Sequence, residues 1–251
     1  MNVGLFIPCY IDQFYPRVGI ATLELLERLG CQVEYPMAQT CCGQPMANSG
    51  YEWKARSVYR HFVDTFHQYD YVVAPSGSCT HHVRHHYDIL EPSQPLQHLR
   101  KRTLDLTEFL FDVLELKSLE AHFPHRVGLH QSCHGLRGLR LGKGSERAGQ
   151  DFSRIRTLLE MVEGIELVEL GRPDECCGFG GTFAVTEAAI SVKMGKDRIK
   201  DHLQHRAEVI TAGDMSCLMH LEGIIRRQGH PLRVMHIVEI LNAGNSPASA
   251  S

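Results

Sequence analysis

Short apolar runs rich in valine and isoleucine recur along the chain and alternate with longer segments of helical period. Runs of this kind are typical of strands whose two faces are both buried. They occupy residues 2–8, 31–36, 71–76, 126–131, 165–170 and 207–213. Residues 17–30 and 154–165 instead repeat their apolar positions every three or four residues, which predicts amphipathic helices. Strands that alternate with helices predict an α/β fold with parallel sheets and right-handed crossovers.

The same pattern occurs twice in the chain. Residues 3–9 read VGLFIPC and residues 127–133 read VGLHQSC, while residues 72–79 (VVAPSGSC) have a counterpart in residues 209–217 (VITAGDMSC). Self-similarity of this kind indicates a repeated structural unit. The sequence therefore predicts two repeated Rossmann-like lobes, each with its own parallel sheet.

The repeat also predicts where the lobes lie along the chain. We expect the first lobe to span residues 1–120 and the second to span residues 121–242. A chain of 251 residues has ample core to fold without disulfide bonds. The last segment, residues 243–251, contains only small and polar residues and is expected to be disordered.

Eight of the nine cysteines follow the repeat. Each half reads single cysteine, Cys-Cys-Gly, single cysteine, with 31 and 36 residues intervening in the first half and 42 and 39 in the second. The eight residues are Cys9, Cys41, Cys42, Cys79, Cys133, Cys176, Cys177 and Cys217. The carboxyl ends of parallel strands meet at one edge of a sheet, and these cysteines lie at or shortly after predicted strand ends. We therefore expect the four thiols of each half to converge at that edge.

The neighbours of the cysteine pairs fit this picture. Gly43 and Gly178 let the backbone pass close to a bound metal in a conformation that a side chain would disfavour. Helix N-termini after the two pairs would direct N–H groups at a site made anionic by thiolates. The ninth cysteine, Cys31, opens a strand at the opposite end, where we expect it to act as a small buried hydrophobe.

Four thiolates from three loops are a ligand set for an iron–sulfur cluster or for zinc. Structural zinc sites usually use CxxC knuckles, and no CxxC occurs in this chain. The missing CxxC also argues against a disulfide-exchange enzyme. We therefore favour iron–sulfur binding, with a zinc-stabilised scaffold or regulatory subunit without a redox role as the alternative.

Charge and hydropathy restrict the class of protein further. The formal net charge of −3 argues against a surface for nucleic acid or anionic membranes. No segment approaches the roughly 18 apolar residues of a membrane span, and the first residues lack the basic start of a signal peptide. We expect a cytoplasmic protein, in whose reducing surroundings nine cysteines serve as metal ligands or redox groups rather than as structural bridges.

Several longer motifs resemble one known family. The two C…CCG…C arrays, with CCGQPMANSGY, PSGSCT, CCGFGGTFAV and VMHIVEIL, are similar to the cysteine-rich (CCG) domain iron–sulfur proteins, and the resemblance covers nearly the whole chain. The cysteine-rich subunit of heterodisulfide reductase and the iron–sulfur subunit of glycolate oxidase are related to this family. The resemblance implies that all eight repeated cysteines bind iron–sulfur clusters, one 4Fe–4S cluster per lobe if both are filled.

The resemblance also implies a function. It points to the electron-transfer component of a bacterial complex that oxidises L-lactate to pyruvate, acting with a second iron–sulfur protein and further subunits. The electron-transfer subunit of a glycolate or heterodisulfide-type oxidoreductase is the alternative within the family. The sequence contains no Ser/His/Asp triad and no flavin or nicotinamide fingerprint, so we expect a subunit without a catalytic site of its own.

One departure from the family pattern affects the ligand set. In heterodisulfide reductase the last cysteine of each repeat belongs to a CxxC, whereas here the final positions are His82 and His220. Imidazole can bind iron, as in Rieske centres. We favour the interpretation that both histidines are neighbours of the ligands, and that each four-cysteine site holds an ordinary 4Fe–4S cluster.

Overall fold

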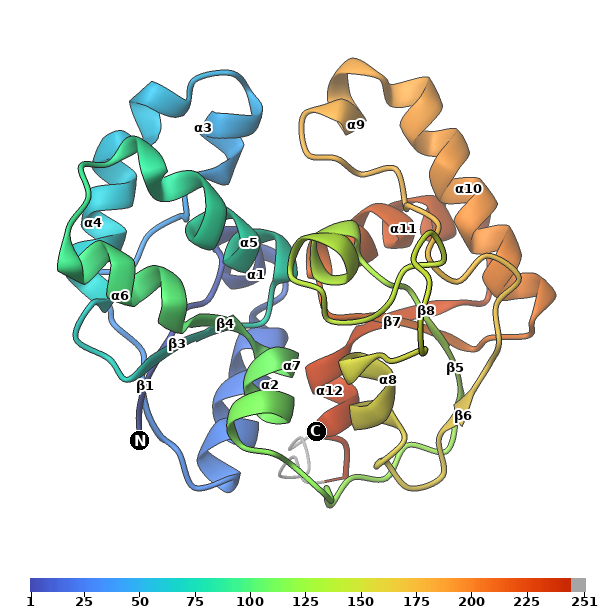
Figure 1. Ribbon diagram of the computed structural model, residues 1–251. Coiled ribbons are helices and arrows are strands. Elements are labelled where there is room, and N and C mark those ends of the chain that lie inside the picture. The colour runs from blue at the N-terminus through green and yellow to red at the C-terminus, as the bar shows by residue number, and fades with distance from the viewer. Residues whose placement is uncertain (245–251) are drawn as a thin grey trace.

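The fold consists of two four-stranded parallel sheets with helices packed around them (Figure 1). The computed structural model describes residues 1–244, so the predicted disorder of the tail concerns residues that lie almost entirely outside the described part. The strand orders are β2-β1-β3-β4 and β6-β5-β7-β8, which are the same order in the two halves. Every strand pair is parallel. The predicted α/β class with two repeated parallel sheets is confirmed.

The first half holds fourteen elements before the chain crosses to the second sheet. In order they are β1 (Asn2–Leu5), α1 (Cys9–Phe14), α2 (Pro16–Arg28), β2 (Gln32–Glu34), α3 (Gln44–Asn48), η1 (Glu52–Ala55), α4 (Arg56–Phe66), β3 (Tyr71–Ala74), α5 (Gly77–His86), η2 (Tyr87–Ile89), α6 (Gln94–Arg102), β4 (Thr103–Asp105), α7 (Leu106–Glu108) and η3 (Phe109–Val113). The prediction that residues 1–120 form a lobe of their own stays a prediction.

The second half repeats the arrangement with different helix lengths. In order its elements are β5 (Arg126–Leu129), η4 (His134–Gly138), α8 (Arg154–Leu159), β6 (Glu166–Leu167), α9 (Phe183–Thr186), α10 (Ala188–Gln204), β7 (Val209–Ala212), α11 (Met215–Gln228), β8 (Arg233–His236) and α12 (Ile237–Leu241). Each of the six apolar runs contains a strand. The fourth strand of each sheet, β4 and β8, was not among the predicted runs.

The helix expected at residues 154–165 is shorter than predicted, because α8 ends at Leu159. Past that point the backbone pairs with a neighbouring segment instead of continuing the helix. The N–H of Glu163 donates to Ala121 O at 2.9 Å, and the N–H of Phe123 donates to Glu163 O at 2.8 Å. Gly164 then adopts a left-handed conformation with φ of +78°. These backbone bonds to a distant segment override the local helical pattern.

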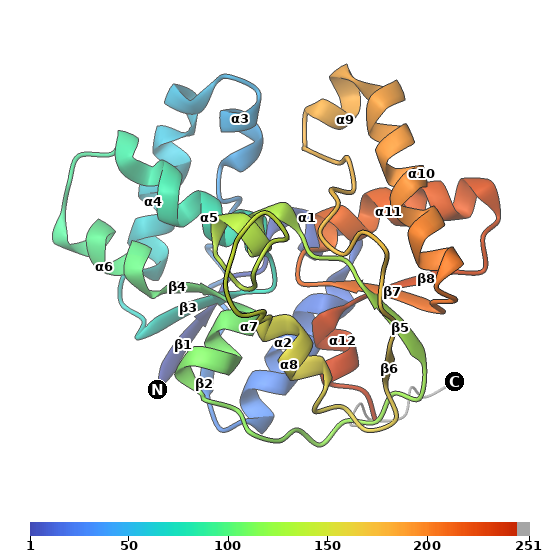
Figure 2. The same ribbon diagram turned by 45° about the vertical axis from the view of Figure 1, so that its right-hand side comes forward.

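Four helices join the two halves beneath the sheets. In both views α2, α7, α8 and α12 lie side by side on the same side of the sheets (Figures 1 and 2). One hydrophobic cluster contains Leu25 and Leu26 of α2 together with Val238 and Leu241 of α12. The two sheets therefore share a continuous core, which fixes the positions of their carboxyl edges relative to each other.

On its other face, each sheet packs against side chains of a different chemical type. Phe6, at the end of β1, packs against Phe62 and Phe66 of α4, with ring centroids 4.8 and 5.7 Å apart. In the second half the fully buried residues of α10 include Arg198 and His202. The repeated backbone thus carries an aromatic layer in the first half and a partly polar layer in the second.

Both fourth strands end in a buried residue that caps the following helix. Asp105 accepts hydrogen bonds from the N–H and the hydroxyl of Thr107, while its second oxygen lies buried without a partner. Burial raises the pKa of Asp105 to about 7, although the bonds from Thr107 act in the other direction. The charges of Glu108 and Asp214 raise the pKa further. His236 caps α12 at the matching position.

Asp105 is expected to make the protein less stable as the pH rises. Its ordinary pKa is 3.8, so between about pH 4 and pH 7 the folded chain keeps a proton that the unfolded chain has released. The free energy of unfolding therefore falls through that window, by up to about 4 kcal/mol for a shift of roughly three units. Asp105→Asn should remove this contribution. Urea unfolding at pH 5 and pH 8 checks it, and equal pH dependence in both proteins would contradict the assignment.

Candidate metal centres

The four cysteines of the first half lie together at the carboxyl edge of their sheet. Cys9 begins α1, Cys41 and Cys42 follow β2 in a loop, and Cys79 lies in the first turn of α5. Side-chain interactions between neighbouring thiols act on their pKa values, between Cys9 and Cys41, between Cys41 and Cys42, and between Cys42 and Cys79. Cys42 and Cys79 are buried, whereas Cys9 is exposed. The structure thus brings these four predicted residues into one chain of sulfur contacts, with Cys9 at its solvent end.

The second half repeats this arrangement. Side-chain interactions between neighbouring thiols act on their pKa values, between Cys133 and Cys176, between Cys176 and Cys177, and between Cys177 and Cys217. Cys177 is buried, and the other three are partly exposed. All eight repeated cysteines therefore meet in two sets of four. Their assignment as metal ligands stays a prediction.

In each set the neighbouring thiols lower the pKa of the first cysteine of the pair. Hydrogen bonds from Cys42 and then from Cys9 lower the pKa of Cys41 to about 3. The N–H of Gly43 donates to the same sulfur at 3.3 Å. Cys176 has a matching environment, in which bonds from its two neighbouring thiols lower its pKa to about 2. In both sets the surroundings therefore favour the thiolate form of this sulfur, the form that binds metal.

The glycine after each pair has a left-handed backbone, with φ of +87° at Gly43 and +89° at Gly178. A Cβ at Gly43 would lie 2.4 Å from a ring carbon of Tyr59. A Cβ at Gly178 would lie 2.6 Å from Ser191 O and 2.7 Å from Met194 Cβ. Both the conformation and the space therefore require glycine at these positions.

Gly178→Ala is expected to destabilise the fold by about 2 kcal/mol or more. The left-handed conformation alone costs an alanine roughly 1–2 kcal/mol, and the clash with a backbone oxygen adds to it. Gly223→Ala is the matched control, because nothing lies within 4 Å of a Cβ placed on this helical glycine. Chemical unfolding should show a large loss for the first variant and none for the second. Equal stability of the two variants would contradict this account.

Helices follow both pairs, as expected, but they contribute little to the sites. Helix α3 has five residues and α9 has four, so neither carries a full-length dipole. One N–H group that contacts sulfur belongs to Gly43, the N-cap residue of α3. In the second half the N–H groups come from the loop before α9, where the N–H of Phe179 donates to Cys177 Sγ at 3.5 Å. Single N–H groups, rather than a full helix dipole, stabilise negative charge on the sulfurs.

His82 and His220 both have partners in the protein. His82 is 2 % exposed, and its Nε2 lies 2.9 Å from the hydroxyl of Tyr59. His220 Nε2 lies 3.3 Å from Ser191 O. Burial lowers the pKa of both imidazoles, to about 3 for His82, so both are neutral. These contacts support the interpretation that both histidines are neighbours of the thiols.

His130 is a candidate site residue that the sequence reasoning missed. Its side chain is fully buried, and neither ring nitrogen has a hydrogen-bond partner. One nitrogen, Cys177 Sγ and Cys217 Sγ lie within 4.8 Å of one another. Burial lowers the pKa of the imidazole to about 4. Aligning VGLFIPC with VGLHQSC would have found it, since His130 replaces Phe6.

The spacing of the sulfurs bears on the choice between zinc and a cluster. Four thiolates around one tetrahedral zinc ion lie within roughly 3.8 Å of one another, given a Zn–S bond of about 2.3 Å. Across residues 1–244, the single group of three or more such ligand atoms lying mutually within 4.8 Å is that of His130, Cys177 and Cys217. Within these residues no three thiols lie mutually within 4.8 Å, so neither set is closed around a single tetrahedral ion.

A buried polar junction connects the two sets. Ser76 and Asp214 form an antiparallel bridge between the halves. The hydroxyl of Tyr10, next to Cys9, lies 3.1 Å from Ser76 Oγ and 3.2 Å from Asp214 Oδ1. Asp214 also accepts the N–H of Ser78 at 2.6 Å and that of Ser216 at 3.0 Å. Since these residues directly precede or follow cysteines, one carboxylate fixes both sets relative to each other.

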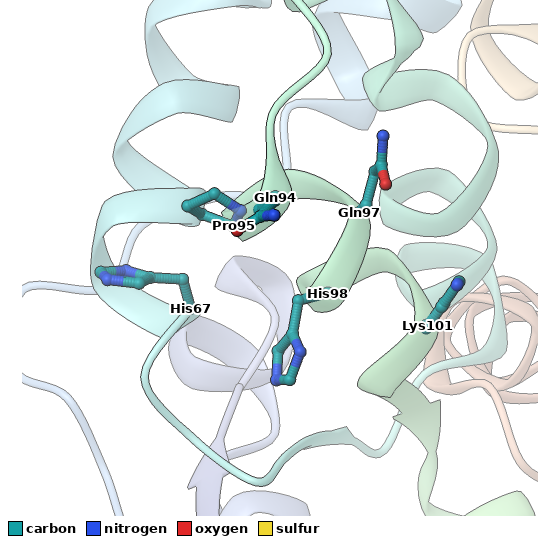
Figure 3. A pocket seen from close by; sticks show the side chains of 6 residues that line it. All are labelled: His67, Gln94, Pro95, Gln97, His98 and Lys101. Carbon is teal, nitrogen blue, oxygen red and sulfur yellow. The ribbon is translucent and has the colours of Figure 1, made fainter.

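A surface pocket of about 510 Å³ lies away from the cysteines, between the end of α4 and α6 (Figure 3). It is lined by His67, Gln94, Pro95, Gln97, His98 and Lys101. The His67 and His98 rings point in different directions, and His67 Nδ1 lies 3.1 Å from Val63 O. The pocket thus presents no convergent ligand set.

The chain contains the family signature twice. The family described as CCG, the cysteine-rich domain, matches residues 3–84 and 127–222. The two matches cover the two repeated α/β halves, each of which has a four-cysteine set at the carboxyl edge of its sheet. The chain belongs to the cysteine-rich (CCG) domain family.

Curated relatives share nearly the whole chain. Lactate utilization protein A of an Exiguobacterium species is 44 % identical over 250 residues, covering 97 % of this chain and 98 % of the relative. Lactate utilization protein A of Geobacillus thermodenitrificans is 43 % identical over 249 residues, covering 98 % and 100 %. Among solved structures, glutamate racemase RacE1 of Bacillus anthracis aligns with a TM-score of 0.35 at 9 % identity, covering 96 % of this chain and 78 % of that one.

Proposed function

We propose that this protein is the iron–sulfur electron-transfer component of a lactate-utilisation system. The observation that carries the proposal is the repeated set of four neighbouring thiols, with N–H groups directed at sulfur and surroundings that lower the pKa of one thiol in each set. The names of the relatives supply the lactate-utilisation context. The open spacing of the thiols favours a cluster over a single zinc ion.

The residues of this chain have distinct roles in the proposed function. A bound 4Fe–4S cluster supplies one-electron exchange at each site. The four thiolates of a set would hold it, and the N–H groups of Gly43 and Gly178 would stabilise negative charge on sulfur. Cys42 and Cys177 are each 2 % exposed and would keep water from the side of the cluster that faces the protein interior. The exposed Cys9 marks the edge from which a partner would reach the first site.

The proposal includes partners, because oxidising a 2-hydroxy acid removes two electrons and two protons, one hydrogen leaving C2 and the other leaving the hydroxyl oxygen. We expect a second iron–sulfur protein and further subunits to provide the catalytic site. Glycolate oxidation would require the same electron transfer, so the substrate of the whole system rests on the relatives alone. The proposal places the protein in the cytoplasm. Within residues 1–244 no helix is long and apolar enough to cross a membrane.

Anaerobic purification followed by analysis of iron, acid-labile sulfide and zinc tests the proposal. Two filled 4Fe–4S sites give about eight iron atoms and about eight sulfides per chain. Stoichiometric zinc without sulfide would refute the proposal and establish the zinc-stabilised scaffold in its place.

A further inference from the structure

His130 lies at the second site in a position with no structural explanation in the protein alone. It directly follows β5, where its backbone N–H donates to Thr211 O at 2.7 Å and fixes the residue at the end of the strand. Its ring is 0 % exposed, and both nitrogens lack partners. Leaving buried polar atoms unpaired costs roughly 1–3 kcal/mol for each group. A buried histidine of this kind calls for a bound partner.

The surroundings of the ring show where such a partner would lie. One ring nitrogen lies within 4.8 Å of the sulfurs of both Cys177 and Cys217. The charge of Cys176 also acts on the ring. Two of the four thiols of the second set thus lie beside the ring. The charge of Arg198, which can only donate hydrogen bonds, also acts on the ring, and His130 in turn acts on His202, whose own ring nitrogens are unpaired.

The first site has no equivalent group. The repeat places Phe6 where the second half has His130, and Phe6 packs into the aromatic layer of α4. An apolar ring would satisfy the packing requirement in the second half as well. The imidazole is therefore a difference between two otherwise matching sites, and it faces the thiols.

We propose that His130 is a nitrogen ligand of the second metal centre, in addition to the cysteine thiolates. The inference rests on the proposed iron–sulfur function. It makes the two centres unequal, with sulfur donors alone at the first and sulfur plus nitrogen at the second.

Pulsed paramagnetic resonance on protein labelled with ¹⁵N-histidine tests the inference. The anaerobically purified, dithionite-reduced protein should show a strong ¹⁵N coupling of the kind that a directly bound nitrogen gives. His130→Phe, which copies the first site, should lose that coupling completely and keep at least half of the iron. His130→Asn serves as the second variant if the phenylalanine variant does not fold. His202→Gln is the matched control, a buried histidine without thiol contact, and should keep the coupling.

The outcomes separate the inference from the function on which it rests. An iron-loaded protein without strong nitrogen coupling, or with coupling unchanged in both His130 variants, overturns the inference alone. A coupling that survives in His130→Phe but disappears in His220→Phe assigns the nitrogen to His220 and also overturns it. A preparation without iron and sulfide overturns the proposed function and the inference together.

Discussion

Replacing Cys42 or Cys177 by serine is expected to remove about half of the iron and to lower the melting temperature by roughly 5–10 °C. Each residue is 2 % exposed and contacts two other thiols of its set, so its loss interrupts the chain of sulfurs in the middle. Ligand binding energy is partly folding energy at such sites, which is why the melting temperature should fall with the iron. Iron analysis and thermal unfolding of the same anaerobic samples check both effects.

Cys31→Ser is the matched control for these variants. Cys31 lies at the amino end of β2 (Gln32–Glu34), at the opposite end of the strand from the first set. We expected a buried side chain, but Cys31 is half-buried. It packs at the margin of the shared core. Iron content should be unchanged, and the melting temperature should shift by no more than about 2 °C. Iron loss equal to that of the Cys42 variant would contradict the assignment of the ligands.

Local sequence patterns determine much of this fold. The apolar runs at β1, β3 and β7 reflect burial, because strands buried on both faces need consecutive apolar residues. The runs at β2 and β6 also contain strands, although these edge strands are largely exposed. The repeat then fixes the order of strands in the second sheet from that in the first. The convergence of the cysteines follows from their positions after strands that share one edge. These features depend on residues close in the chain.

The fourth strands show where local patterns fail. β4 has the sequence TLD and β8 has RVMH, so neither presents a continuous apolar run. Their strand conformation comes from pairing with β3 and β7, which are already placed in the sheets. Such pairing joins segments far apart in the chain, and short polar strands give no signal of it. The shortened helix α8 has the same cause.

The candidate site residues also differ in whether local sequence patterns reveal them. The repeated cysteines could be found from the sequence because their pattern is chemical and periodic. The junction at Asp214 could not, since Tyr10 and Asp214 are 204 positions apart and only the shared core brings them together. His130 lies between these cases. Its significance depends on the absence of a hydrogen-bond partner, which only the folded structure reveals.

The purified protein alone is expected to oxidise lactate no faster than a blank in the presence of an artificial dye acceptor. Taking a hydride or its equivalent from C2 needs a base for the hydroxyl proton, a cationic clamp for the carboxylate and an acceptor of two electrons. The sequence contains no flavin or nicotinamide fingerprint that would supply the two-electron step. The same preparation should nevertheless be reducible by dithionite, as bleaching of its visible absorption would show.

Adding the partner subunits should restore lactate oxidation. The reconstituted system then tests which cysteines of this chain are needed for turnover. Cys42→Ser, provided that its fold survives, should assemble with the partners and still block turnover, because electrons would stop at the damaged first set. Cys31→Ser should support turnover at the wild-type rate, since it lies at the opposite strand end. Steady-state dye reduction measures both, with size-exclusion chromatography as the check on assembly. Rapid lactate oxidation by the isolated chain would show that it holds a substrate site of its own and would refute the electron-transfer role.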